Sequence, residues 1–160
     1  MKATEIIELN QLYASKKCMA LAEHPGIYLK PEFAMELSSH RYNWIRRDLA
    51  KNTAISQLPE VAMKLATDED LNVHRFLASN PAMAQLPAVA MELTNSEAPV
   101  VLINLAQNPA ISQLPEVAMK LAANKVPAVR YTLTCNPAIA QFPEVAMKLA
   151  NDQELSIFNI

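Results

Sequence analysis

The side chains that most often do chemistry in proteins are few in this sequence and widely spaced. Histidine occurs three times and cysteine twice, as His24, His40, His74, Cys18 and Cys135. Their spacing is not that of a zinc site, in which the ligands come in close pairs. With a single glycine, Gly26, the chain also lacks a glycine-rich loop that could hold a phosphate group. We therefore expect a protein that is not an enzyme and that binds neither a metal nor a cofactor.

Two other patterns could carry chemistry, and each has a simpler structural interpretation. Residues 68–70, Asp-Glu-Asp, form an acidic run, which we expect to be a solvated turn that caps the next helix. Methionine recurs at a constant interval, at Met35, Met63, Met91, Met119 and Met147. Such a column could be a soft metal site or an adaptable binding groove. We expect it instead to pack between layers of the fold.

The methionine column belongs to a tandem repeat with a 28-residue period. Segment 52–66 recurs with few changes at residues 80–94, 108–122 and 136–150. One period before Pro59 lies Pro31, at the start of a diverged copy. Self-similarity at such a period is typical of a solenoid. We expect about five repeats over residues 24–160, preceded by an N-terminal helical cap at residues 1–23.

The composition predicts helices. Hydrophobic residues make up 51% of the chain and glycine occurs once, whereas sandwiches and barrels need glycine-rich turns and alternating β-branched residues. Each repeat is expected to contain two helices, such as residues 59–66 and 71–79, with a short 3-10 turn at residues 81–85. Asn80 before Pro81 is expected to close the second helix, because asparagine tolerates the left-handed conformation. The predicted fold is an all-α, right-handed-type α-solenoid.

Helical spacing also predicts the orientation of each helix. On the second helix, Val73 and Leu77 lie on one side and should face the core, and the other copies have equivalent apolar pairs. On the first helix, Glu60 and Lys64 are four residues apart and should form an ion pair on the outer side.

Several short elements follow one another in a fixed order within the repeat. They are Asn-Pro, then Leu-Pro-Glu-Val-Ala-Met-Lys-Leu-Ala at 58–66, the acidic loop 68–70, Val-His-Arg at 73–75, and Asn-Pro again at 80–81. In this order they resemble the leucine-rich repeat variant family, a group of bacterial repeats within the HEAT-like α-solenoids. The resemblance covers roughly residues 24–160 and implies a solenoid that works by binding.

Two features differ from that family. The 28-residue unit is longer than the family's usual repeat, which favours true α-helices in both segments. Some members also carry an iron–sulfur cluster on cysteines near the N-terminus. Only Cys18 lies there in this chain, so we expect no such cluster.

Comparison of the copies separates positions that packing fixes from positions that change freely. The freely changing side chains lie on the second helix, opposite its core side, and include Trp44, Arg47, Lys51, Arg75, Ile103 and Tyr131. A flanking column contains Arg46, His74 and Arg130. In solenoids the second helices commonly line the face that binds a partner. We expect these side chains to form a stripe that binds another protein, whose identity the sequence does not give; neutral surface drift would produce the same variation.

Two places on this stripe allow two interpretations each. Trp44 has Arg41, Arg46 and Arg47 close in sequence, and an aromatic residue with basic neighbours is typical of an interface anchor. Alternatively, Trp44 packs against the N-terminal cap. Residues 100–103, Val-Val-Leu-Ile, are apolar on every side of their helix, so they form a contact patch unless neighbouring turns cover them.

Nucleic acid is the alternative partner. Residues 1–52 carry eight Lys and Arg against six Asp and Glu, while residues 53–160 carry six against ten. Arg41, Arg46, Arg47 and Lys51 form a basic cluster that could follow a phosphate backbone. An isoelectric point near 5.9 is far from the basic footprint of most nucleic-acid binders, so we favour protein.

The chain's last residues and its cysteines bear on assembly and location. Ile157, Phe158 and Ile160 are apolar, and they could join two copies into a homodimer at the C-terminal end of the solenoid or mark a truncated chain. Cys18 and Cys135 lie four repeats apart, too far for a disulfide. Free thiols suit a reducing cytoplasm, and no apolar run reaches the roughly 20 residues of a membrane span. We expect a cytoplasmic protein without a membrane segment.

Overall fold

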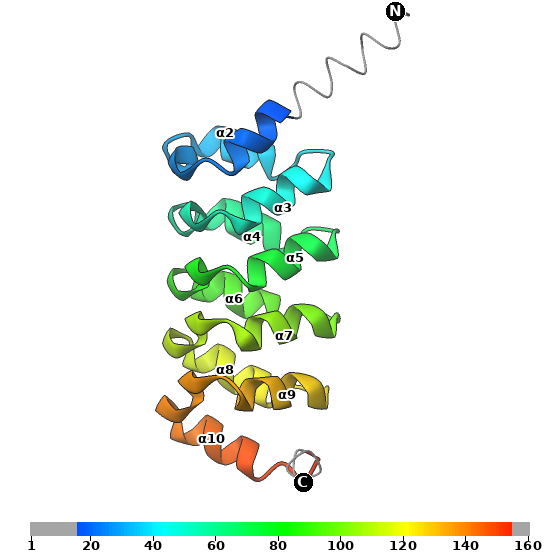
Figure 1. The fold of residues 1–160 in the computed structure, drawn as a ribbon, viewed down its shortest axis with the longest axis vertical. Coiled ribbons are helices and arrows are strands. Elements are labelled where there is room, and N and C mark those ends of the chain that lie inside the picture. The colour runs from blue at the N-terminus through cyan, green and yellow to red at the C-terminus, as the bar shows by residue number, and fades with distance from the viewer. Residues whose placement is uncertain (1–15, 155–160) are drawn as a thin grey trace, which may run out of the picture.

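The computed structural model describes residues 16–154, and within that range the chain is helical with no β-strand. Figure 1 shows the helices stacked as successive layers along one axis, from the N-terminal to the C-terminal end. Such stacking is the architecture of an α-solenoid. Residues 1–15 of the expected cap lie outside the described residues, and so do Ile157, Phe158 and Ile160 of the expected dimer end.

Each layer is built from three kinds of short helix. The first is a 3-10 helix: η1 (Pro25–Leu29), η2 (Thr53–Gln57), η3 (Pro81–Gln85), η4 (Pro109–Gln113) and η5 (Pro137–Gln141). The second is an α-helix that begins at a proline, here called an A helix: α2 (Pro31–Leu37), α4 (Pro59–Ala66), α6 (Pro87–Leu93), α8 (Pro115–Ala122) and α10 (Pro143–Ala150). The third, here called a B helix, follows within the layer: α3 (Asn43–Lys51), α5 (Leu71–Ala78), α7 (Pro99–Gln107) and α9 (Pro127–Thr134).

Each kind of helix stacks on its own kind. A helices contact A helices in the next layer, B helices contact B helices, and the 3-10 helices form a third column. Figure 1 shows the B helices α3, α5, α7 and α9 one below another on one side of the stack. Because every layer repeats this arrangement, side chains one repeat apart in the sequence lie in vertical columns.

Proline and apolar spacing explain why the A helices form where they do. Pro59 occupies the first helical turn of α4, where its missing N–H has no partner to lose. Val61, Ala62 and Leu65 are buried, because their spacing places them on one side of the helix. The other A helices repeat this pattern, so a continuous apolar core runs the length of the stack.

The prediction that Asn80 closes a B helix in the left-handed conformation is wrong. Asn80 has φ −72° and ψ 124°, which is extended backbone, and no non-glycine residue in 16–154 has a positive φ. Its side chain instead caps the 3-10 helix that follows, since its Oδ1 accepts a hydrogen bond from the N–H of Ala82 at 2.9 Å. The 3-10 turn expected at residues 81–85 is confirmed as η3.

The same asparagine joins two layers. Asn80 Nδ2 donates to the carbonyl of Ala50 at 2.8 Å and to that of Asn52 at 3.1 Å, both in the preceding layer. Asn52, Asn108 and Asn136 make the equivalent three bonds. All four residues are buried. They form an asparagine ladder along the solenoid, in which each rung satisfies backbone groups that water does not reach.

The ladder reaches into the N-terminal cap. Asn52 Nδ2 donates to the carbonyls of Ala22 and His24, which lie where Ala50 and Asn52 lie one layer later. His24 replaces the asparagine at this level, because its Nδ1 accepts a hydrogen bond from the N–H of Gly26 at 3.0 Å. Residues 16–22 are helical, and they therefore stand at the position of a B helix.

The ion pair predicted between Glu60 and Lys64 is not formed. Lys64 reaches the preceding layer, where its ammonium group donates to the hydroxyl of Ser39. Lys120 does the same, donating to Asn95 Oδ1 at 2.7 Å. Lys64 and Lys120 therefore make solvent-exposed hydrogen bonds to the preceding layer, which contribute little to stability, instead of an ion pair within their own helix.

Two further sequence-based expectations can be compared with the described residues. Cys18 and Cys135 are both unpaired, as their separation in the repeat predicts. None of the helices in residues 16–154 combines the length and the apolar character that a membrane crossing requires.

Candidate partner-binding surface

The B helices turn one side toward the core and the other toward solvent. Their core side consists of apolar pairs that are fully buried: Ile45 and Leu49, Val73 and Leu77, Val101 and Leu105, and Val129 and Leu133. The predicted core pairs are therefore confirmed. The opposite side of each B helix must then face outward, because successive residues advance by about 100° around a helix.

Twelve side chains form this outward surface, here called the B face. They are Trp44, Arg47, Lys51, Asn72, Arg75, Ser79, Val100, Ile103, Gln107, Ala128, Tyr131 and Cys135. Every one of them is exposed or half-buried. Six of the nine predicted stripe residues belong to this surface.

The three other predicted stripe residues do not. Arg46 and Arg130 are buried, each only 7% exposed, and Leu102 of the same column is buried as well. His74 is half-buried, and its Nε2 atom is buried without a hydrogen-bond partner. Their column lies beside the core side of the B helix, where the loop of the next layer covers it. The inclusion of Arg46 and Arg130 in an exposed stripe was wrong, whereas His74 is half-buried, as Arg47 and Arg75 are.

The two buried arginines hold neighbouring layers together. Arg46 forms a bidentate pair with Asp68, with Nε 2.6 Å from Oδ2 and Nη2 2.9 Å from Oδ1. Its Nη1 also donates to the carbonyl of His40 at 2.7 Å. Arg130 makes the equivalent contacts with Asp152 and with the carbonyl of Asn124, and it also pairs with Glu154. These arginines are structural.

The acidic residues of these pairs belong to a column that sequence reasoning missed. His40, Asp68, Ser96, Asn124 and Asp152 stand one repeat apart, just before each B helix or after α10. Each accepts a hydrogen bond from the backbone N–H two residues later. The residue types differ, but all can accept such a bond. The side chain of Asp68 is therefore buried within the turn, only 5% exposed, rather than solvated. Asp70 caps α5 as expected.

The contacts of Arg46, Arg130 and His40 shift the pKa values of these side chains. The hydrogen bond from Arg46 to Asp68 raises the pKa of that guanidinium, and Asp152 does the same for the pKa of Arg130. Burial lowers the pKa of His40, and the nearby charges of Arg41 and Arg46 lower it further. A neutral His40 keeps its Nδ1 free to accept the N–H of Tyr42 at 3.2 Å.

The N-terminal half of the B face is basic. Arg47, Lys51 and Arg75 surround the ring of Phe76, with the Lys51 Nζ atom 4.4 Å and the Arg75 Cζ atom 5.0 Å from the ring centroid. Asp48 lies beneath them with its side chain 3% exposed, and its Oδ1 contacts both Arg47 and Lys51. Two of the three cations, Arg47 and Lys51, therefore share one buried carboxylate.

An aromatic stack lies at the N-terminal edge of the B face. Trp44 stacks on Tyr42, with ring centroids 4.3 Å apart and planes tilted by 12°. The Arg41 guanidinium lies 4.5 Å from the Tyr42 centroid and donates to its hydroxyl at 2.8 Å. Trp44 itself is 39% exposed. Its indole is thus held in place while one part stays open to solvent, which suits an interface anchor.

The C-terminal half of the B face carries no formal charge. Val100, Ile103 and Gln107 come from α7, and Ala128, Tyr131 and Cys135 come from α9. Val100 is 36% and Tyr131 41% exposed. The apolar run at residues 100–103 was predicted to be either a contact patch or covered by neighbouring turns, and each interpretation holds for part of it. Val101 and Leu102 are buried, whereas Val100 and Ile103 remain accessible.

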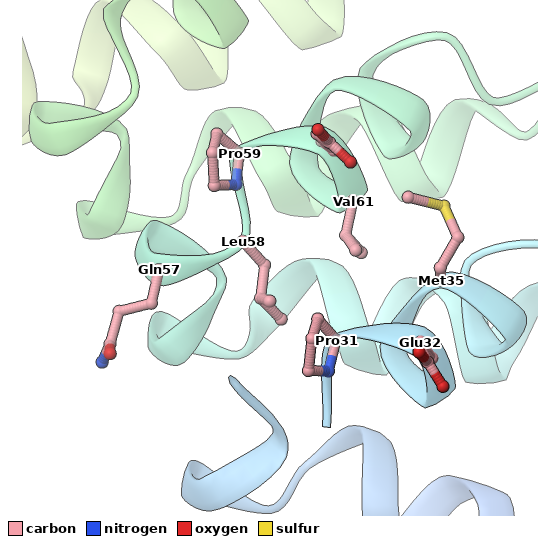
Figure 2. Close-up of a pocket in the computed structure, with 8 residues that line it drawn as sticks. Pro31, Glu32, Met35, Gln57, Leu58, Pro59 and Val61 are labelled. Atoms are coloured by element: carbon pink, nitrogen blue, oxygen red, sulfur yellow. The ribbon is translucent and has the colours of Figure 1, made fainter. Parts of the chain in front are cut away.

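A row of hollows lies on the other side of the solenoid, between successive A helices. Figure 2 shows the one between α2 and α4, of about 430 Å³, into which Met35, Leu58 and Val61 point, while Gln57 points away. Hollows of about 410 and 650 Å³ recur between later A helices. The later hollows are lined by residues at the equivalent repeat positions, among them Met91 and Met119. Met35, Met63, Met91 and Met119 also pack against the core, as predicted for the methionine column, whereas Met147 is 65% exposed.

These hollows offer apolar floors and a few glutamates. The side chains that line the first are Pro31, Glu32, Met35, Gln57, Leu58, Pro59, Glu60 and Val61. That set contains no histidine, cysteine or hydroxyl group that could act as a nucleophile or share a proton with a carboxylate. Among residues 16–154, no three His, Cys, Asp or Glu side chains are grouped closely enough to hold a metal ion.

Comparisons of the chain with protein-family models, with curated proteins and with solved structures gave no match. The geometry of the molecule itself therefore carries the functional argument.

Proposed function

We propose that this chain is a non-catalytic scaffold that binds a protein partner through the B face. The contrast between the two sides of the same helices carries the proposal. The core side of every B helix keeps a β-branched residue followed four positions later by leucine, whereas the B face changes from Trp44 and Arg47 to Val100 and Ile103. Positions that packing does not determine are free to be selected for a partner.

Surface composition supports a protein rather than a small molecule as that partner. Exposed aromatic residues and arginine, which are enriched at protein interfaces, occur together at α3 and α5. The B face is also long and open, and extended open surfaces of solenoids typically bind macromolecules.

The proposal includes the finer features predicted from the sequence. The repeat period predicts a right-handed-type solenoid of about five 28-residue repeats, the motif order suggests a relationship to the leucine-rich repeat variant family, and the free thiols suggest a role in the cytoplasm. The stacked layers and the column of 3-10 helices are compatible with that form.

Nucleic acid is the alternative partner, and the described charges weigh against it. Arg46 is buried against Asp68, so the cations that the B face offers are Arg47, Lys51 and Arg75, all in its N-terminal half. The B face between α7 and α9 offers no cation to a phosphate backbone, whereas binding to nucleic acid depends on many such contacts.

Affinity capture from the source cell tests the proposal. The triple variant Trp44→Ala/Arg47→Ala/Arg75→Ala should lose a partner that the wild type recovers, by about tenfold or more, since it removes the aromatic and charged anchors. Lys64→Ala/Lys120→Ala on the A helices is the control, because it also removes two cations. Equal recovery by the wild type and both variants would refute binding through this half of the B face.

A further inference from the structure

The two halves of the B face differ in charge along the solenoid axis. Arg47, Lys51 and Arg75 belong to the half formed by α3 and α5, and the half formed by α7 and α9 consists of neutral side chains. A partner that lies along the stack meets both halves at once. Its own chemistry must therefore change along its length.

The cations of the basic half are held in place without being fully neutralised. Asp48 is the carboxylate that contacts Arg47 and Lys51, at 3.2 Å and 3.1 Å. Phe76 holds Lys51 and Arg75 through its ring face, and such a contact positions a cation without removing its charge. An arriving carboxylate thus meets preorganised donors with an excess of positive charge, which strengthens binding.

The neutral half presents apolar side chains that water solvates poorly. Val100, Ile103 and Tyr131 are at least partly accessible, and covering them would add roughly 25 cal/mol for each Å² of apolar surface removed from water. A charged partner segment would lose hydration here without gaining a counter-charge. This half therefore favours apolar side chains.

We propose that the occupant of the B face is a protein segment with a block of Asp or Glu residues next to a block of apolar residues. The acidic block lies over α3 and α5, and the apolar block lies over α7 and α9. Four stacked helices at roughly 10 Å spacing extend over about 30 Å, which roughly nine extended residues can cover. The inference rests on the proposed function and specifies the chemistry of its partner.

Synthetic peptides test this polarity directly. One set carries glutamates in one half and leucine and phenylalanine in the other, made in both chain directions. A second set has the same composition with the two kinds of residue alternating, and a third has glutamine in place of glutamate. Binding to the whole chain is measured by fluorescence anisotropy at low salt. One of the block peptides should bind about tenfold more tightly than the alternating and glutamine peptides.

Variants of the chain then locate the two contacts. The variant Arg47→Ala/Lys51→Ala/Arg75→Ala should weaken binding of the block peptide about tenfold and make that binding less dependent on salt. Binding of the glutamine peptide should stay unchanged. Lys64→Ala/Lys120→Ala/Lys148→Ala removes the same charge from the A helices and should have no effect. Ile103→Asp should weaken both the block and the glutamine peptide, because it places a charge on the apolar half.

Three results would overturn the inference. The first is equal affinity for block and alternating peptides, and the second is equal loss in the two triple-alanine variants. The third is tighter binding of a single-stranded oligonucleotide than of any peptide, which would assign the basic half to nucleic acid. If no peptide binds but cellular capture still depends on Trp44, Arg47 and Arg75, the partner chemistry is wrong and the proposed function stands.

Discussion

Replacement of Asn80 by alanine is expected to lower the free energy of unfolding by roughly 3 to 5 kcal/mol, a large part of the 5 to 15 kcal/mol typical of a domain. The substitution removes one donor group and one acceptor that make three buried hydrogen bonds. It leaves the carbonyl of Ala50 and the N–H of Ala82 without the hydrogen bonds that the asparagine makes, and the carbonyl of Asn52 with only the N–H of Ile55. Each unsatisfied buried group costs about 1 to 3 kcal/mol, and local relaxation recovers part of that loss. Urea denaturation followed by circular dichroism measures the change.

Two comparisons isolate the ladder from other effects. Gln85→Ala changes an exposed residue of the same 3-10 helix and should alter stability by less than about 0.5 kcal/mol. Asn80→Asp keeps the shape and the acceptor but removes the donor, so it should destabilise at least as much as alanine. A loss below about 1 kcal/mol for Asn80→Ala would show that the ladder does not stabilise the stack.

Separating Arg46 from Asp68 is expected to have an effect of similar size. Their side chains are 8% and 5% exposed. Arg46→Leu leaves the carboxylate of Asp68 buried without a counter-charge. Asp68→Asn leaves the buried guanidinium of Arg46 with only the exposed carboxylate of Glu69, 3.7 Å from its Nη2 atom. Breaking a buried pair from one side typically costs about 3 to 5 kcal/mol. Urea denaturation at neutral pH measures both single variants.

The repeat itself supplies the matched control for this pair. Two layers later, the position of Arg46 is occupied by Leu102 and that of Asp68 by Asn124. Asn124 still accepts the N–H two residues later, at 2.9 Å. The double variant Arg46→Leu/Asp68→Asn therefore copies a pair that the chain already contains. The double variant should recover most of the free energy of unfolding that either single variant loses. If the losses of the two single variants simply add in the double variant, the buried-pair account is contradicted.

The sequence predicted much of the fold because a repeat shows each structural constraint several times. The 28-residue spacing of Pro59 and its equivalents identified the A helices, and pairs such as Val73 and Leu77 identified the core side of the B helices. Helical spacing then gave the outward arc correctly for Trp44, Arg47 and Ile103. These features depend on local periodicity, which a sequence displays directly.

What the sequence did not predict depends on contacts between layers. In the sequence, Asn80 before Pro81 is typical of a helix end. Only its hydrogen bond to the carbonyl of Ala50 reveals that it bridges two layers. Arg46 lies next to the outward arc on a helical wheel, but the loop of the next layer buries it. The signal available in advance was the coupled change of Arg46 with Asp68 into Leu102 with Asn124, at the same sequence separation in each case. The hollows between A helices gave one signal, the methionine column, but on a helical wheel its positions look like ordinary core positions.

The central claim is that the B face, and not the A helices, contacts the protein partner. A photoreactive amino acid placed at Ser79 on the B face, and separately at Lys64 on an A helix, tests it in the source cell. Both positions are exposed, so neither substitution should disturb packing. The account predicts a crosslinked protein from position 79 and none from position 64. Crosslinking from position 64 alone, or to nucleic acid from position 79, would contradict it.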